Sequence, residues 1–165
     1  MIFDQKKRFE NFYQAYYRMV FQLCLGFLKG DDEQAKDLTQ EVFMQVWNNL
    51  EKFREDSSPK TWIYRITVNA CLNHLKKQKI SSEKIGEVIR DQESAEEINS
   101  DENDSVKELY KAMAELSEVD RLITGFLLEE MSHEEIASIM GITEGNLRVK
   151  IHRIKQRLKK LINHE

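Results

Sequence analysis

The sequence predicts an all-α protein made of two small helical domains, the second ending in a helix-turn-helix. The chain of 165 residues contains one proline and six glycines, and 33% of its residues are charged, which leaves little of the turn punctuation that a β-rich protein needs. Apolar residues recur at steps of three and four along most of the chain, as on amphipathic helices. This periodicity fades in residues 81–104, where nine acidic residues accumulate against two basic ones. We therefore expect a flexible acidic linker there, between domains 1–80 and 105–165.

The first domain is predicted to open with an aromatic-rich helix over residues 9–28, whose apolar residues share one face and pack into the core. Gly30 ends this helix, and Asp31 or Asp32 caps a second helix that runs to about residue 50. The inward face of the second helix is apolar and consists of Ala35, Leu38, Val42 and Val46.

The outward face of the second helix carries a candidate docking surface. Its members are Asp37, Gln40, Glu41 and Met44, with Trp47 on the flank. An acidic rim around exposed apolar side chains is typical of a site that binds another protein. A solvated helix face, with Trp47 packed into the core, explains the same pattern equally well.

A polar loop over residues 53–58 separates the second helix from a long third one, which Ser58 caps and Pro59 begins. One narrow polar strip on the third helix holds Trp62, Arg65, Asn69, Asn73 and Lys76. Aromatic, guanidinium and amide groups in this arrangement suit a single nucleic-acid strand, whose bases stack and whose phosphates pair with cations. The alternative places Trp62 in the core and leaves the other side chains solvated.

The second domain is predicted to contain four helices, the first two capped by Ser105 and Ser117. Residues 132–162 then form two helices joined by a tight turn. Ser132 and Glu135 have capping-box spacing, Gly141 tolerates the left-handed backbone of the turn, and Thr143 caps the last helix. The last helix buries a stripe that consists of Leu147, Ile151, Ile154, Leu158 and Leu161.

The opposite side of the last helix is a candidate DNA-reading face. Its members are Asn146, Arg148, Val149, Lys150, His152 and Arg153, and Gly145 among them leaves room for a close approach. In helix-turn-helix proteins the second helix enters the major groove, where such side chains meet base edges. A solvated basic face on an amphipathic helix is the plainer alternative.

Neither catalysis nor a cofactor is expected from this sequence. The four histidines lack metal-ligand spacing, and Cys24 and Cys71 are interpreted as core thiols. We find no phosphate-cradling glycine loop or nucleophile motif, so we expect no small-molecule substrate. The start of the chain lacks an apolar signal core and no apolar run reaches membrane-spanning length, so we expect a cytoplasmic protein without direct membrane insertion.

Three segments in this order resemble the extracytoplasmic-function (ECF) group of bacterial sigma factors: DLTQEVFMQVW at 37–47, SSPKTWIYRITVNACLNHLKK at 57–77, and residues 116–161. The resemblance implies that the first domain is like sigma region two, which binds core RNA polymerase at the clamp helices. It assigns the docking surface to that contact. It also implies that the loop at Arg54 and the polar strip capture the melted strand of the −10 promoter element.

By the same resemblance, the second domain is like sigma region four, which reads the −35 element of promoter DNA and packs on the polymerase flap. The function implied is promoter-specific transcription initiation, with an anti-sigma factor as a further partner. Two other classes stay open. A stand-alone helix-turn-helix regulator would have no use for the docking surface, and a helical adaptor would leave the Gly145 face unexplained.

Overall fold

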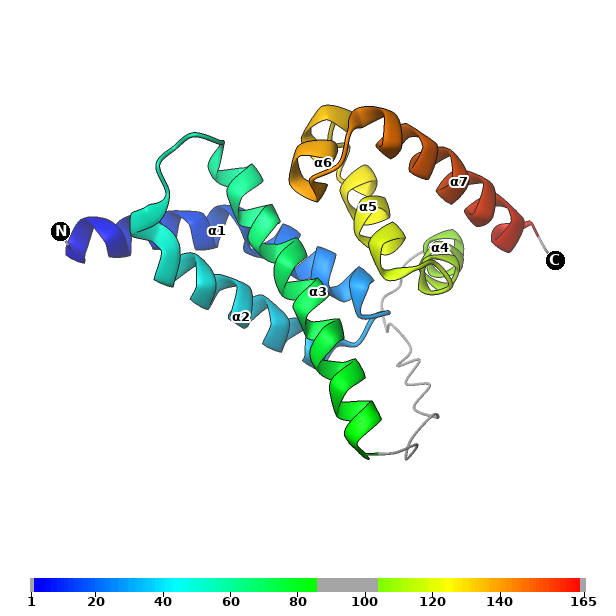
Figure 1. The fold of residues 1–165 in the computed structure, drawn as a ribbon, viewed down its shortest axis with the longest axis horizontal. Helices are drawn as coiled ribbons and strands as arrows, with labels where there is room; N and C mark the ends of the chain where they lie inside the picture. The colour runs from blue at the N-terminus through cyan, green and yellow to red at the C-terminus, as the bar shows by residue number, and fades with distance from the viewer. Residues whose placement is uncertain (1, 86–103, 164–165) are drawn as a thin grey trace.

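The computed structural model describes residues 2–85 and 104–163, and within them it contains helices and no strand. The elements are α1 (Ile2–Phe27), α2 (Asp32–Asn49), the short 3-10 helix η1 (Leu50–Lys52), α3 (Pro59–Ile85), α4 (Asp104–Ala114), α5 (Glu118–Leu128), α6 (His133–Met140) and α7 (Glu144–Ile162). The all-α prediction is confirmed. Figure 1 shows α1, α2 and α3 at the left and α4 to α7 at the upper right.

Most helix ends lie where local chemistry predicted them. The side chains of Asp31, Ser117 and Thr143 each accept a hydrogen bond from a backbone N–H of the first turn that they cap. Ser132 and Glu135 form the full capping box, and Gly141 has a φ of 70°. These signals need only neighbouring residues, which is why the sequence reveals them.

Three predicted boundaries are corrected. Helix α1 begins at Ile2 rather than near residue 9, because charged residues that form helices well precede the apolar stripe. Helix α3 continues to Ile85, and Asp104 already belongs to α4, so these parts of the expected 81–104 linker are helical. Ser105 lies inside α4 rather than at its cap. The rest of the expected linker, 86–103, lies outside the described residues.

The first three helices pack around a core rich in aromatic side chains. Val20, Leu23 and Phe27 of α1 are buried with Leu38 and Val42 of α2. The predicted inward face of α2 is therefore buried, but that of α1 is buried only toward its C-terminal end, since Tyr13, also expected in the core, is 42% exposed. Figure 1 shows α3 crossing α1, with α2 beside them.

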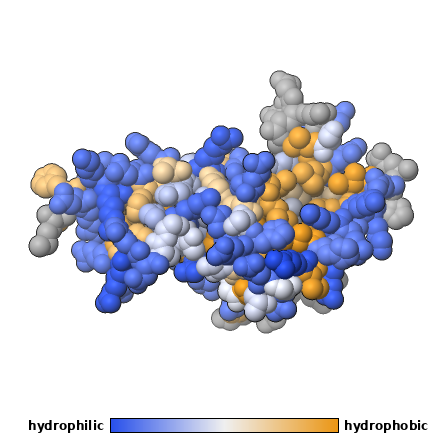
Figure 2. Space-filling model, turned by 90° about the horizontal axis from the view of Figure 1, so that it is seen from above, coloured by the Kyte–Doolittle hydropathy of each residue, from blue (hydrophilic) through white to orange (hydrophobic). Residues whose placement is uncertain are grey.

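The helix-turn-helix is formed by α6 and α7, supported by α4 and α5. Leu147, Ile151 and Ile154 of the predicted stripe are buried, Leu158 is half-buried, and Leu161 at the end is exposed. Figure 2, viewed from above, shows hydrophilic residues over the α1 end and hydrophobic residues gathered toward the half that holds α4 to α7.

The two groups of helices pack directly on each other. Helix α1 contacts α4 and α5, helix α3 contacts α6, and the buried residues of both groups belong to one continuous cluster. This packing was not foreseen from the sequence, which treated the two domains as separate bodies.

Candidate functional site

The predicted docking surface lies on the exposed side of α2. Asp37, Gln40 and Glu41 are exposed, and Met44 is 64% exposed. Their helix is fixed from behind by buried Ala35, Leu38, Val42 and Val46. The face therefore needs none of these exposed side chains to hold its place in the fold.

Trp47 combines the two arrangements that the sequence allowed, because it packs against the protein and also remains partly exposed. Its ring meets Phe9 of α1 edge-on at a centroid distance of 5.3 Å, yet the residue remains 37% exposed. Phe43, buried beside it, meets Tyr13 at 4.9 Å. These edge-to-face contacts hold the rings in place, and they leave Trp47 partly exposed while Phe43 is buried.

Between α1 and α2 these side chains line an open groove of about 370 Å³, formed by Phe9, Tyr13, Gln40, Phe43, Met44, Trp47 and Asn48. The groove is mostly apolar. The exposed acidic residues Asp37 and Glu41 belong to α2, the helix that forms one wall of the groove. A rigid apolar floor beside carboxylates suits an apolar side chain carried on a basic or polar helix of another protein. Sequence periodicity placed the α2 residues on this face but missed Phe9 and Tyr13, which come from the other helix.

The two carboxylates of the docking surface differ in their surroundings. Glu41 pairs with Lys77 of α3 at 3.6 Å between Oε1 and Nζ. Asp37 forms no ion pair within residues 2–85 and 104–163. Because the Glu41 pair is exposed, it contributes no more than about 1 kcal/mol to stability.

Only part of the polar strip on α3 is exposed and, within the described residues, without polar contacts to other side chains. Asn69 and Lys76 are exposed, as is Arg54 in the preceding loop. Trp62 instead lies half-buried and stacked on Phe53, with ring centroids 4.6 Å apart and planes at 28°. The alternative in which Trp62 packs against the protein therefore describes the structure.

Arg65 reaches across to the other domain. Its Nε donates to the carbonyl oxygen of Ser138 at 3.3 Å, and a terminal guanidinium nitrogen donates to the Ser138 hydroxyl at 2.8 Å. No sequence signal marks this contact, because a serine on the outer side of α6 resembles any solvated residue.

The reading face of α7 is open to solvent. Asn146, Arg148, His152 and Arg153 are exposed, Val149 is 50% exposed, and Lys150 is half-buried. A Cβ built on Gly145 meets nothing within 4 Å. Arg148 forms an exposed ion pair with Glu144 one turn earlier, at 3.6 Å, which is weak enough to exchange for a phosphate or base.

Little else in the described part of the chain suggests chemistry. It contains no group of metal-ligating side chains and no helix long and apolar enough to cross a membrane. Cys24 and Cys71 are both buried, as predicted. A hydrogen bond of the Cys71 thiol with Cys24, together with burial, holds the pKa of Cys71 well above its ordinary value, so this thiol stays protonated.

The fold thus contains a helix-turn-helix with an open reading face on α7, and a separate exposed face with an apolar groove on α2. Comparison with known families defines the class of protein. Residues 12–80 match the family described as Sigma-70 region 2, and residues 107–158 match Sigma-70, region 4. Together these regions identify a sigma factor, the promoter-recognising subunit of RNA polymerase.

Relatives identify the group within that class. The chain is 30% identical to the ECF RNA polymerase sigma factor SigM of Bacillus subtilis, over 93% of this chain and 94% of that one. It is 31% identical to the ECF RNA polymerase sigma-E factor of Escherichia coli K12, over 92% and 84%. The chain belongs to the ECF group of RNA polymerase sigma factors.

A solved structure shares the fold. The sigma factor RpoE of Bartonella quintana, crystallised with the anti-sigma factor NepR, superposes with a TM-score of 0.82 at 20% identity, covering 96% of this chain and 99% of that one. As an ECF sigma factor, the protein binds core RNA polymerase and directs initiation at promoter DNA.

Proposed function

We propose that the docking surface of α2 is the principal contact with core RNA polymerase, at the clamp helices of its largest subunit. The observation that carries this proposal is the open apolar groove between α1 and α2, together with the exposed carboxylates of Asp37 and Glu41 on the same helix. Met44 and Trp47 supply the apolar contact, and the carboxylates steer a basic partner into register.

We assign the −10 contact to Arg54, Arg65, Asn69 and Lys76, which can meet phosphates and base edges of a melted strand. Trp62 contributes to this contact indirectly. Its ring stacks on Phe53 and so positions the loop that carries Arg54. Flipping a base out of the duplex costs a few kcal/mol, which stacking and polar contacts must offset.

The −35 contact belongs to the reading face of α7. Asn146, Arg148, Val149 and Arg153 occupy the N-terminal and middle turns of the helix, where groove contacts fall. Lys150 and His152 complete the set near the DNA backbone. We further propose that this domain also packs on the polymerase flap. Each DNA contact alone is weak, and one polymerase holding both domains makes them strong together.

We also propose that the protein acts in the cytoplasm, without a cofactor or catalysis of its own, and that an anti-sigma factor regulates it. Support for the anti-sigma factor is that the Bartonella relative of the same fold was crystallised with one. The alternative of a stand-alone regulator is not favoured, because both sigma regions match and such a regulator has no use for the α2 groove.

The test is a pair of substitutions in the docking surface, Asp37→Lys and Met44→Ala, compared with Glu108→Lys on exposed α4. All three positions are exposed, so each change should move the free energy of unfolding by no more than about 0.5 kcal/mol. Affinity for core polymerase should fall at least about tenfold for the first two, and stay unchanged for Glu108→Lys. Wild-type affinity in both α2 variants would place the polymerase contact elsewhere.

A further inference from the structure

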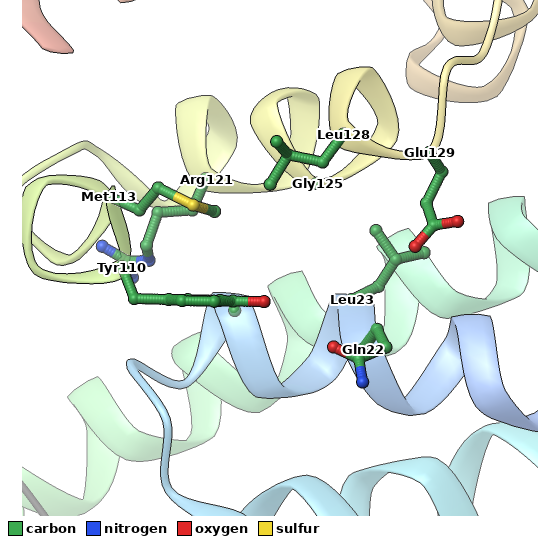
Figure 3. Close-up of a pocket in the computed structure, with 9 residues that line it drawn as sticks. Gln22, Leu23, Tyr110, Met113, Arg121, Gly125, Leu128 and Glu129 are labelled. Carbon is green, nitrogen blue, oxygen red and sulfur yellow. The ribbon is translucent and has the colours of Figure 1, made fainter. Parts of the chain in front are cut away.

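Helix α1 has an arginine against an aromatic ring at each of its ends. At its C-terminal end, buried Arg121 of α5 lies over the ring of Phe27 and donates to the Phe27 carbonyl oxygen at 3.0 Å. Figure 3 shows this end of α1, with Leu23 directed toward α5 beside Gly125. That contact belongs to the packing of the two domains. At the N-terminal end the arginine is Arg8, and it contacts the loop over residues 53–58.

Arg8 is connected to this loop in two ways. A terminal guanidinium nitrogen donates to Oε1 of Glu55 at 3.3 Å, which makes the contact an ion pair as well as a hydrogen bond. The guanidinium also lies over the ring of Phe53, 5.2 Å from its centre, and over that of Phe12 in its own helix, at 5.6 Å. Because the guanidinium is planar, stacking and pairing together fix its orientation.

The loop is anchored at Phe53 and then leaves the protein surface. Phe53 is 7% exposed, and its ring stacks on that of Trp62 with centroids 4.6 Å apart. Arg54 and Glu55, which follow, are exposed. Within residues 2–85 and 104–163, the pair with Arg8 is the one hydrogen bond or salt bridge that links residues 54–57 to the rest of the protein. The position of this part of the loop therefore depends on Arg8.

The backbone of Glu55 needs a contact of this kind. Its φ is 61°, in the left-handed region that residues with a Cβ rarely adopt. Asparagine and aspartate are tolerated there because their short side chains form local hydrogen bonds, but glutamate gains no such help. Such a conformation persists only when its surroundings hold it. Since Arg54 directly precedes this turn, the direction in which Arg54 projects follows from the turn.

We propose that Arg8 is a positioning residue for promoter recognition: it pins the 53–58 loop in its left-handed turn and so directs Arg54 toward the −10 strand, without itself contacting DNA. The proposal rests on the function proposed above for that loop. A strand that meets a preformed loop does not have to order it, so none of the binding free energy is lost to ordering. Without Arg8 the loop populates several conformations, and the apparent affinity falls with the fraction of loops in the competent one.

Arg8→Met tests this role, because methionine is a good helix former and keeps an apolar side chain against the rings but cannot pair with Glu55. Arg18→Met is the matched control, since Arg18 is exposed on the same helix and its replacement changes the net charge equally. Two second substitutions are added to Arg8→Met. Glu55→Asn places a residue that tolerates the left-handed backbone without a cation. Glu10→Gln, at an exposed position of α1, restores only the net charge.

The first measurement reports on the loop alone. In the free, full-length protein, trypsin should cleave after Arg54 faster in Arg8→Met than in Arg18→Met, because cleavage requires the loop to leave its folded conformation. Mass spectrometry of the fragments identifies the bond that is cleaved, and far-ultraviolet circular dichroism checks that both variants keep their helices.

The second measurement reports on recognition by the holoenzyme. Fluorescence anisotropy compares the non-template −10 strand of a promoter that the wild type transcribes with a scrambled strand. Affinity for the −10 strand should fall about tenfold in Arg8→Met if the freed loop is competent one time in ten. Affinities for the scrambled strand and for core polymerase should equal those of Arg18→Met. Adding Glu55→Asn should restore discrimination between the strands, and adding Glu10→Gln should not.

Three results would overturn the proposal. They are wild-type discrimination in Arg8→Met, unchanged trypsin cleavage after Arg54, and rescue by Glu10→Gln as complete as that by Glu55→Asn, which would reduce the role of Arg8 to its charge. Arg54→Ala separates such a failure from a failure of the proposed function. If Arg54→Ala alone loses discrimination, the loop still reads the −10 strand and only the role of Arg8 is removed. If Arg54→Ala discriminates like the wild type, the assignment of the loop itself is wrong.

Discussion

Gly145→Ala should have opposite effects on stability and on promoter binding. Gly145 is the second residue of α7, and a Cβ at this position meets nothing within 4 Å. Glycine inside a helix costs about 0.5–1 kcal/mol relative to alanine. Because no clash offsets this gain, the free energy of unfolding should rise by up to about 1 kcal/mol in urea titrations of the free protein.

Promoter binding should fall in the same variant if α7 enters the DNA major groove with Gly145 facing the DNA. A methyl group forced into a close-packed contact costs about 1–3 kcal/mol, which corresponds to a loss of roughly five- to 150-fold in affinity. Fluorescence anisotropy of the holoenzyme on duplex DNA that carries the −35 element measures the loss. Equal affinity for Gly145→Ala and the wild type would mean that this side of α7 does not face DNA.

Gly141→Ala provides the contrast on the stability side. Its site is equally open, with nothing within 4 Å of a Cβ, but φ is 70°. The left-handed backbone costs a non-glycine residue about 1–2 kcal/mol, so this variant should lose stability by that amount while Gly145→Ala gains. The pair therefore separates backbone strain from contact with DNA.

Three further predictions concern the reading face, the melting step and the helix cap. Arg148→Ala and Arg153→Ala should each weaken recognition of the −35 element by about 1–3 kcal/mol, measured by competition with scrambled DNA; unchanged discrimination in the double variant would remove both from the reading face. Arg65→Ala should leave holoenzyme assembly intact but slow open-complex formation in permanganate footprinting, and a premelted template should restore the rate unless Arg65 has another role. Ser132→Ala should lower the free energy of unfolding by about 0.5–2 kcal/mol, whereas a change near zero would mean that the capping box is dispensable.

The sequence was enough to predict where most helices begin and which side of a helix is buried. Asp31, Ser132 and Thr143 cap the helices that they were expected to cap, and Gly141 makes the turn, because each signal acts over three or four residues. The stripe at Leu147, and the outward position of Asp37 on α2, follow from the helical period alone. The resemblance to sigma factors then supplied the class, which the family matches show.

What covers a given face was decided only by the tertiary structure. The sequence did not decide whether Trp47 and Trp62 are buried or exposed. An aromatic side chain at the edge of an apolar face packs or protrudes according to its neighbours, which here are Phe9 and Phe53. Most of the candidate surface residues were found, but the second wall of the α2 groove was not, because it comes from α1.

The contacts between the two domains could not be predicted from the sequence. Arg65 meets Ser138 across 73 residues, and Arg121 meets Phe27 across 94. Periodicity says which side of a helix is apolar, but it does not say which distant helix that side will meet. Pairing α5 with α1 depends on shape, on the missing side chain of Gly125 beside Leu23, and on an open carbonyl at a helix end. Such complementarity exists only between folded surfaces, so it appears only when the helices are placed in space.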